Sequence, residues 1–195
     1  MKYRYVIGID EAGRGPLAGP VAVGAVLLPW KSQRFFKGVR DSKKISAEKR
    51  EQWFLKLKGS EGVGCRYKVV MNSAKVIDQK GIVFAIRNAL TRAIRHFKVN
   101  PNKCLVLLDG GLRAPPEFIY QKTIIRGDDK EVSISLAAIA AKVTRDHFMK
   151  KVAKKFPGYG LEIHKGYGTV KHFKSLRKLG PSIIHRESFL SSLRG

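Results

Sequence analysis

The chain begins with short apolar segments whose composition favours β-strands, and this pattern constrains the fold more than any other feature. Residues 3–9 (YRYVIGI) are rich in β-branched and aromatic side chains, and residues 21–28 (VAVGAVLL) form a second, mostly buried strand candidate. The segment GRGPLAGP between them is rich in glycine and proline and indicates a turn. Residues 64–71 are a third strand candidate. We therefore expect the fold to be built on a β-sheet.

Helix candidates alternate with further strands along the rest of the chain. Ser46 and Ser133 are candidate N-caps, each at the start of a segment with helical character. The helix candidates are residues 46–57, 82–97, 133–152 and 170–179, and the further strands are residues 104–108 and 123–125. The sequence shows no internal repeat, long linker or low-complexity segment. We expect a single α/β domain over residues 1–195 with a mixed central sheet.

The net charge indicates the class of partner. The 195 residues include 39 Lys and Arg against 15 Asp and Glu, which gives a formal net charge of +24. Residues 147–195 alone hold eleven basic side chains and two acids. This excess favours a polyanionic partner, because each contacted phosphate releases counterions and strengthens binding. We expect nucleic acid, although a solvated surface or a nucleoid or ribosomal binding protein would carry the same charge.

Other features of the composition exclude several classes of protein. A hydrophobic fraction of 44% argues against disorder. No apolar run approaches the roughly 20 residues of a membrane helix, and Asp10 stands where a signal peptide would need its apolar stretch. Cys65 and Cys104 are too few for a disulfide framework, and no Cys or His cluster has zinc spacing. We expect a cytoplasmic protein, without a membrane partner, whose cysteines are reduced core residues.

The positions of the few acidic residues indicate a site. Asp10 and Glu11 follow an apolar strand candidate, Asp109 ends another, and Asp128 precedes the buried helix candidate. Ligand sites gather at strand ends in an open α/β sheet, and neighbouring carboxylates repel unless a cation offsets their charge. Hard oxygen ligands suit Mg²⁺ or Mn²⁺, and two such ions can hydrolyse a phosphodiester. A turn at Asp109 and a helix cap at Asp10 remain the alternatives.

Six blocks of the sequence, in order, resemble ribonuclease HII. The similarity runs from Gly8 to Phe189. The blocks are GIDEAGRG with LAGP (residues 8–20), DSKK (41–44), LDG (108–110), GD (127–128) followed by AKVTRD (141–146), HKGYGT (164–169) and IHRESF (184–189). Ribonuclease HIII is an alternative family. That family usually has an added N-terminal domain, which we do not expect here because the first block already begins near Asp10, and Tyr167 in its glycine context favours HII.

The resemblance implies a fold and an activity. The fold is ribonuclease H-like: a five-stranded mixed sheet flanked by helices, here with a basic C-terminal helical segment. The implied activity is metal-dependent endonucleolytic hydrolysis of RNA in RNA–DNA hybrids, and cutting 5′ to ribonucleotides embedded in duplex DNA. The products carry a 5′-phosphate and a 3′-hydroxyl. Such an enzyme removes ribonucleotides from DNA, and we expect it to act as a monomer with Mg²⁺ or Mn²⁺.

The resemblance also assigns roles to residues of this chain. The implied catalytic and metal-binding residues are Asp10, Glu11, Asp109 and Asp128, and the implied substrate-binding residues are Gly13, Arg14, Gly15, Lys43, Lys165 and Tyr167. The two glycines allow close approach of the backbone to the sugar, and Arg14 offers a planar fork to phosphate. Asp146, beside Arg145 in the helix candidate, is the alternative to Asp128 but favours an ion pair. The chain departs from the family at Gly81, Ile86 and Ala138, where polar side chains are common.

Overall fold

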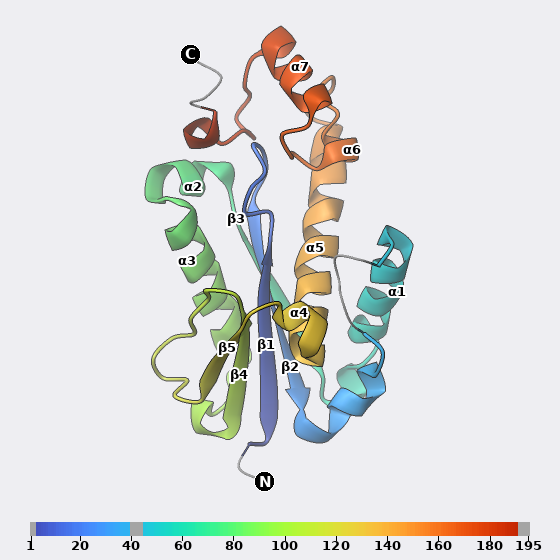
Figure 1. Ribbon diagram of the computed structural model, residues 1–195, viewed down its shortest axis with the longest axis vertical. Coiled ribbons are helices and arrows are strands. Elements are labelled where there is room, and N and C mark those ends of the chain that lie inside the picture. The colour runs from blue at the N-terminus through green and yellow to red at the C-terminus, as the bar shows by residue number, and fades with distance from the viewer. Residues whose placement is uncertain (1–2, 40–44, 191–195) are drawn as a thin grey trace.

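The computed structural model describes residues 3–39 and 45–190, and its centre is a five-stranded mixed sheet in the order β3-β2-β1-β4-β5 (Figure 1). The strands are β1 (Tyr5–Ala12), β2 (Val21–Pro29), β3 (Arg66–Asn72), β4 (Cys104–Asp109) and β5 (Gln121–Ile124). β1 pairs antiparallel with β2 and parallel with β4. The expected five-stranded mixed sheet is confirmed.

Helices cover both faces of this sheet. In Figure 1, α3 lies on one side of the strands, and α5 and α1 lie on the other. The α-helices are α1 (Ala47–Lys58), α2 (Ala74–Lys80), α3 (Ile82–Arg95), α4 (Gly127–Lys130), α5 (Val132–Ala153), α6 (Leu161–His164) and α7 (Val170–Leu179). Short 3-10 helices are η1 (Trp30–Phe36), η2 (Glu61–Val63), η3 (Pro101–Lys103) and η4 (Glu187–Phe189). None of the described helices is long and apolar enough to cross a membrane.

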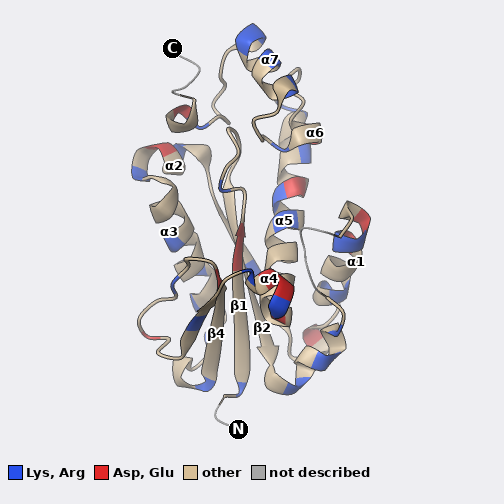
Figure 2. Ribbon diagram, viewed as in Figure 1, with Lys and Arg blue, Asp and Glu red and all other residues tan. Residues whose placement is uncertain are grey.

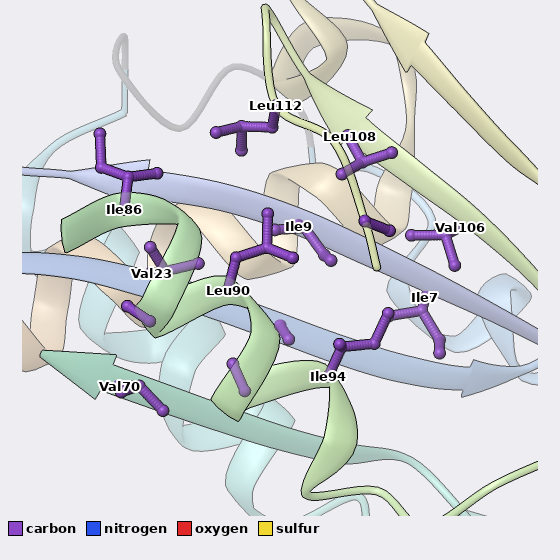
Figure 3. Close-up of a cluster of buried hydrophobic side chains, with 14 of the residues drawn as sticks. Ile7, Ile9, Val23, Val70, Ile86, Leu90, Ile94, Val106, Leu108 and Leu112 are labelled. Carbon is purple, nitrogen blue, oxygen red and sulfur yellow. The ribbon is translucent and has the colours of Figure 1, made fainter. Parts of the chain in front are cut away.

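The main core lies between α3 and the sheet. Apolar side chains recur along α3 at helical spacing, so Ile86, Leu90 and Ile94 project from one face of the helix. They pack on strand residues that include Ile9 and Val106, as Figure 3 shows. Burying each such side chain contributes about 1.5–3 kcal/mol relative to leaving it exposed. This layer fixes the positions of β1 and β4, whose ends carry the acidic residues.

The long helix α5 packs on the opposite face at an unusually short distance. A Cβ placed on Gly8 of β1 would lie 2.1 Å from the backbone carbonyl carbon and oxygen of Ser133, and one on Gly24 of β2 would lie 2.3 Å from the carbonyl oxygen of Ala137. Only residues without a side chain allow such contact between a strand and a helix backbone. The two glycines therefore set how deeply α5 sits against the sheet.

Several element boundaries differ from the sequence predictions. β1 begins at Tyr5 and runs through Asp10 and Glu11, so these acids lie within the strand instead of after it. Ser46 accepts a hydrogen bond from the Lys49 backbone N–H and caps α1 as predicted. The predicted Ser133 cap is wrong: Ser133 is buried inside α5, and Glu131 occupies the N-cap position without a side-chain cap. The helix could start earlier because α4 leads directly into it. Cys65 and Cys104 are free and buried, as expected.

The C-terminal part of the chain packs on the end of α5. α6 and α7 enclose a separate apolar cluster with Met149 and Ala18, and the predicted basic helix is confirmed as α7. Gly19 N–H donates to the Ile184 carbonyl at 2.8 Å, and Leu17 N–H donates to the Gly166 carbonyl at 2.8 Å. The turn after β1 is thus joined to segments far along the chain.

Candidate active site

The register of two parallel strands brings the acidic residues together. Ile9 of β1 pairs with Leu108 of β4, so the next residues, Asp10 and Asp109, lie side by side. Asp109 is the last residue of β4. This is the adjacency predicted from the sequence, and it follows because parallel neighbours end at the same edge of a sheet. In Figure 2, acidic positions on β1 and α4 lie in the middle of the molecule.

The fourth predicted acid comes from the one-turn helix α4. Asp128 is 1% exposed. The preceding residue, Gly127, donates its backbone N–H to Asp109 Oδ1 at 2.7 Å, which ties α4 to the end of β4. Ser135 Oγ donates to the backbone carbonyl of Asp128 and joins α4 to α5. These bonds place Asp128 beside the strand acids, although the short helix itself was not predicted.

Burial and neighbouring negative charges raise the pKa of the two acids on β1. Burial raises the pKa of Asp10 well above its usual value, and the charges of Glu11, Asp109 and Asp128 raise it further. The hydrogen bond from the Glu11 backbone N–H to Asp10 Oδ1, at 2.7 Å, acts in the opposite direction. Burial also raises the pKa of Glu11, partly offset by Arg14, whose Nη1 lies 3.5 Å from Glu11 Oε1. The site therefore holds negative charge at an energetic cost.

Asp146 lies apart from this group. Its Oδ1 accepts a hydrogen bond from Lys142 Nζ at 2.9 Å, one turn earlier on α5. The partner is therefore Lys142, although the sequence had drawn attention to the neighbouring Arg145. Within residues 3–39 and 45–190, no three His, Cys, Asp or Glu side chains converge as a finished metal site. The three strand acids and Asp128 of α4 are close enough for the charges of the other three to act on Asp10, without a completed ligand geometry.

A cavity of about 450 Å³ lies next to the acids and joins most of the predicted site residues. One part is formed by Asp10, Glu11 and Asp109, and another by the turn at residues 13–15 and by Tyr167. The remaining lining residues are Ala12, Arg50, Ala138 and Lys142. Sequence reasoning missed Arg50 and Lys142; Lys142 stands inside the matched block AKVTRD, which was the available signal. Ala138, one of the family departures, faces this cavity.

Two buried arginines hold the segment between β1 and β2, residues 13–20, which contains the glycine turn. Arg186 is fully buried and donates to the backbone carbonyls of Gly13 at 2.6 Å, Arg14 at 2.9 Å and Gly19 at 2.9 Å. Arg145 donates to the carbonyls of Ala18 at 3.1 Å and Pro20 at 2.8 Å. Charge-assisted bonds of this kind are among the strongest in proteins. The turn is therefore a rigid wall of the cavity.

The two glycines of the turn have different surroundings. A Cβ on Gly13 would lie 2.1 Å from Arg145 Nε, and its φ of 86° also favours glycine, so Gly13 is required by the packing of the turn. At Gly15 a Cβ would meet no atom within 4 Å. The open side of the turn is thus at Gly15, where room for a close ligand exists.

The lining of the cavity, as far as the described residues form it, includes neither of the two lysines predicted to contact substrate. Lys43 lies outside the described residues. Lys165 Nζ donates to the backbone carbonyls of Glu162 and Ile163, and burial lowers its pKa. Of the other family departures, Gly81 occupies the N-cap position of α3, and Ile86 lines a smaller cavity beside Arg14 and Leu112.

The sheet topology and the acidic strand edge define a protein with the ribonuclease H-like fold. Two solved structures share it. The PCNA:RNase HII complex from Archaeoglobus fulgidus contains a chain that matches with a TM-score of 0.74 at 24% identity, over 93% of each chain. Bst-RNase HIII in complex with Mn²⁺ matches with a TM-score of 0.65 at 16% identity, over 97% of this chain and 66% of that one.

The family is fixed by sequence similarity. The family model of ribonuclease HII matches residues 7–192. Ribonuclease HII from Caldicellulosiruptor bescii is 45% identical over 191 residues, which are 98% of this chain and 89% of the relative. The chain belongs to the ribonuclease HII family, and it is an endoribonuclease of the ribonuclease H kind.

Proposed function

We propose that this enzyme hydrolyses the RNA strand of RNA–DNA hybrids and cuts 5′ to ribonucleotides embedded in duplex DNA, leaving a 5′-phosphate and a 3′-hydroxyl. One observation carries the proposal: a single cavity combines the carboxylates of two strand edges with a rigid glycine turn and the ring of Tyr167. The carboxylates suit phosphodiester hydrolysis, and the turn with the tyrosine suits recognition of sugars. All these residues come from one chain, so we propose that a monomer suffices.

The proposed cofactor is Mg²⁺ or Mn²⁺, held by Asp10, Glu11, Asp109 and Asp128. The donor set fits, because hard carboxylate oxygens are the ligands these ions prefer. The electrostatics fit as well: burial and then the neighbouring carboxylates raise the pKa of Asp10, and a bound cation would stabilise the charged form. The structural neighbour Bst-RNase HIII was solved with Mn²⁺. Two such ions, when bound, activate a water and stabilise the leaving oxygen.

Recognition of ribose is assigned to the turn and the tyrosine. The backbone at Gly15 is open to the cavity and can donate or accept hydrogen bonds close to a sugar. Arg14, whose side chain is 60% exposed, can bind a phosphate through its guanidinium. Tyr167, 43% exposed, offers a flat ring to the deoxyribose and a hydroxyl to the ribose. The 2′-hydroxyl is the group that distinguishes RNA from DNA at this position.

Basic side chains around the cavity would hold the phosphates. Lys142 lines the cavity directly, while Lys165 would have to release the two carbonyls it binds before reaching a phosphate. We propose both, together with Lys43, as phosphate contacts and expect Lys142 to contribute most. Each contact adds about 0.9 to the slope of log affinity against log salt on a duplex.

The test is cleavage of a labelled DNA duplex that holds one ribonucleotide. We expect a cut on the 5′ side of the ribonucleotide with Mg²⁺ or Mn²⁺, no cut in EDTA and no cut in an all-DNA duplex. Asp109→Asn is expected to lower the rate at least about a thousandfold, or roughly 4 kcal/mol, while binding survives or tightens because a negative charge near phosphate is removed.

The matched control is Asp129→Asn, which makes the same change of charge on α4 at a position outside the cavity lining. It should keep most of the activity. Wild-type-like turnover in Asp109→Asn would reject the assigned carboxylates, and cutting of the all-DNA duplex would reject recognition of ribose.

A further inference from the structure

Three buried histidines lie beneath the loop that carries Tyr167. His164 ends α6, His172 is in α7, and His185 lies in the segment after α7; their exposures are 9%, 0% and 2%. The rings of His164 and His172 are stacked, with centroids 4.3 Å apart, and those of His172 and His185 are 5.3 Å apart. None of them is part of the lining described for the catalytic cavity. The proposed function assigns no role to these three histidines.

The hydrogen bonds fix where the protons of two of these rings lie. His172 Nδ1 is 2.9 Å from the Tyr167 carbonyl, which only accepts, so Nδ1 carries the proton. His185 Nδ1 is 3.0 Å from the backbone N–H of Ser182, which only donates, so this nitrogen accepts. The Ser182 hydroxyl, also 3.0 Å from this nitrogen, can donate to it as well. A contact of the same nitrogen with the Ser182 carbonyl is longer, 3.3 Å, and that carbonyl already accepts the His185 backbone N–H at 2.9 Å.

The remaining ring nitrogens complete a chain of hydrogen bonds, here called the relay, in which every bond has its donor on the same side. The Nε2 atoms of His172 and His185 are 3.1 Å apart. Since His172 already carries its proton on Nδ1, His185 Nε2–H must donate to His172 Nε2. Hydrogen bonds then run in one direction from the Ser182 N–H, through both neutral rings, to the Tyr167 carbonyl. A second proton on either ring would break the relay, because it would put two donors face to face or remove the acceptor at His185.

The environment keeps these rings neutral. Burial lowers the pKa of His172 to about 4, and the neighbouring His164 and His185 lower it as well, against the raising effect of its backbone hydrogen bonds. Burial is also the main cause that lowers the pKa of His185, and it outweighs the raising effect of the contact with the Ser182 backbone. Both rings are therefore uncharged near neutral pH, as the relay requires.

The relay ends on the backbone of the residue that senses the sugar. The Tyr167 N–H donates to the His164 carbonyl at 2.9 Å, and its carbonyl accepts from the Thr169 N–H at 2.8 Å as well as from His172. The side chain projects into the cavity, where Lys142 Nζ and Arg145 Cζ lie 5.8 and 5.9 Å from the ring centroid. With so much of the ring exposed, its position depends on how firmly its backbone is held.

We propose that His172, oriented by His185, is a positioning residue that fixes Tyr167 for recognition of the ribose–deoxyribose junction. The inference rests on the proposed role of Tyr167 and adds the device that holds it in place. A displacement of about 1 Å in a positioning group can cost roughly a hundredfold in rate. Loss of the bond from His172 to the Tyr167 carbonyl should therefore affect a substrate with a junction in the cut strand more than a continuous RNA–DNA hybrid, where that junction is absent.

A pair of amide substitutions isolates the bond to Tyr167. The amide nitrogen of Asn takes the place of histidine Nδ1, so His172→Asn keeps a donor toward the Tyr167 carbonyl. The amide group of Gln takes the place of Nε2, so His172→Gln keeps a partner for His185 and loses the bond to Tyr167. We expect His172→Gln to lower kcat on a single-ribonucleotide duplex at least about tenfold, the equivalent of one buried hydrogen bond of about 1.4 kcal/mol. On the hybrid the loss should stay within about threefold.

Three further measurements decide between positioning and a purely structural role. His172→Asn should retain activity within about threefold on both substrates. His172→Phe, which keeps a flat ring and loses both nitrogens, should repeat the defect of His172→Gln; if it does not fold, the Asn and Gln pair still decides. In Tyr167→Ala the further change His172→Gln should have no additional effect on the junction substrate, because the group that it positions is gone.

The outcomes separate this inference from the proposed function. Equal losses of His172→Gln on the two substrates, or equal activities of the Asn and Gln variants, would overturn the positioning role. If Tyr167→Ala itself loses equally on both substrates, the junction-sensing role of Tyr167 fails and the inference falls with it. A junction-specific loss in Tyr167→Ala without one in His172→Gln leaves the proposed function standing and rejects the relay.

Discussion

Replacing Gly8 by alanine should push α5 slightly away from the sheet. The new Cβ would lie 2.1 Å from two backbone atoms of Ser133 and 2.5 Å from the Ile134 nitrogen, whereas ordinary contact begins at 3.4 Å. The obstacle is the backbone of a 22-residue helix, which has no flexible side chain that could give way. The helix must therefore move outward by about 1 Å. Overpacking of this kind costs about 1–3 kcal/mol, and we expect the upper end.

The expected effects are large enough to measure separately. For a chain of this size, about 3 kcal/mol lowers Tm by roughly 6–12 °C, which thermal unfolding followed by circular dichroism will show. The displaced helix also carries Ala138 and Lys142 of the cavity lining. The cleavage rate, measured well below both unfolding midpoints, should therefore fall by about ten- to a hundredfold even though the variant is folded.

Gly62→Ala is the matched control for this experiment. A Cβ on Gly62 would meet no atom within 4 Å, so the same substitution should leave Tm unchanged or slightly raised. If Gly8→Ala melts within about 2 °C of the wild type and cuts at the wild-type rate, the close approach of α5 to β1 does not hold and the packing described above is wrong.

Two further predictions concern single side chains. Because burial lowers the pKa of His172 to about 4 while the unfolded chain titrates near 6.5, the unfolded state binds a proton that the folded state does not. The free energy of unfolding should therefore fall as the pH drops from about 6.5 to about 4, and urea titrations should show a smaller fall in His172→Asn; parallel pH curves would contradict the buried neutral ring. Asp128→Asn should impair metal-dependent turnover in a folded protein, whereas Asp146→Asn should mainly lower Tm by breaking the ion pair with Lys142; the reverse pattern would assign the fourth ligand to Asp146.

The elements that sequence predicted well are those with a local signal. The apolar spacing of residues 82–97 corresponds to α3, and the apolar run that begins at Cys104 corresponds to β4. The adjacency of Asp10 and Asp109 followed from the parallel pairing expected for an α/β sheet. The Ser133 cap failed because α4 leads directly into α5, so the serine lies within the helix, where it packs against Gly8 of a strand far away in sequence.

The parts that sequence did not predict depend on contacts between distant segments. Arg145 and Arg186 both belong to blocks of the sequence that resemble the family. Their hydrogen bonds to the segment between β1 and β2, however, join positions that are 125 to 173 residues apart. The histidine relay likewise needs α7 and the segment after it to fold back beneath Tyr167. Periodicity reports which face of an element is buried, and it contains no information about such closures.

The bonds from Arg186 to Gly13 also have a consequence for how the protein is made. The carbonyl and the guanidinium are 173 positions apart in the chain, and ribosomes add about 5–20 residues per second. The turn therefore waits on the order of 10–35 s after its own synthesis before the arginine that holds it exists. During that interval the turn at residues 13–15, which lines the cavity next to the strand acids, lacks its hydrogen bonds to Arg186. A nascent chain should consequently be unable to cut nucleic acid until Arg186 has emerged from the ribosome, and activity should appear only after that point of translation.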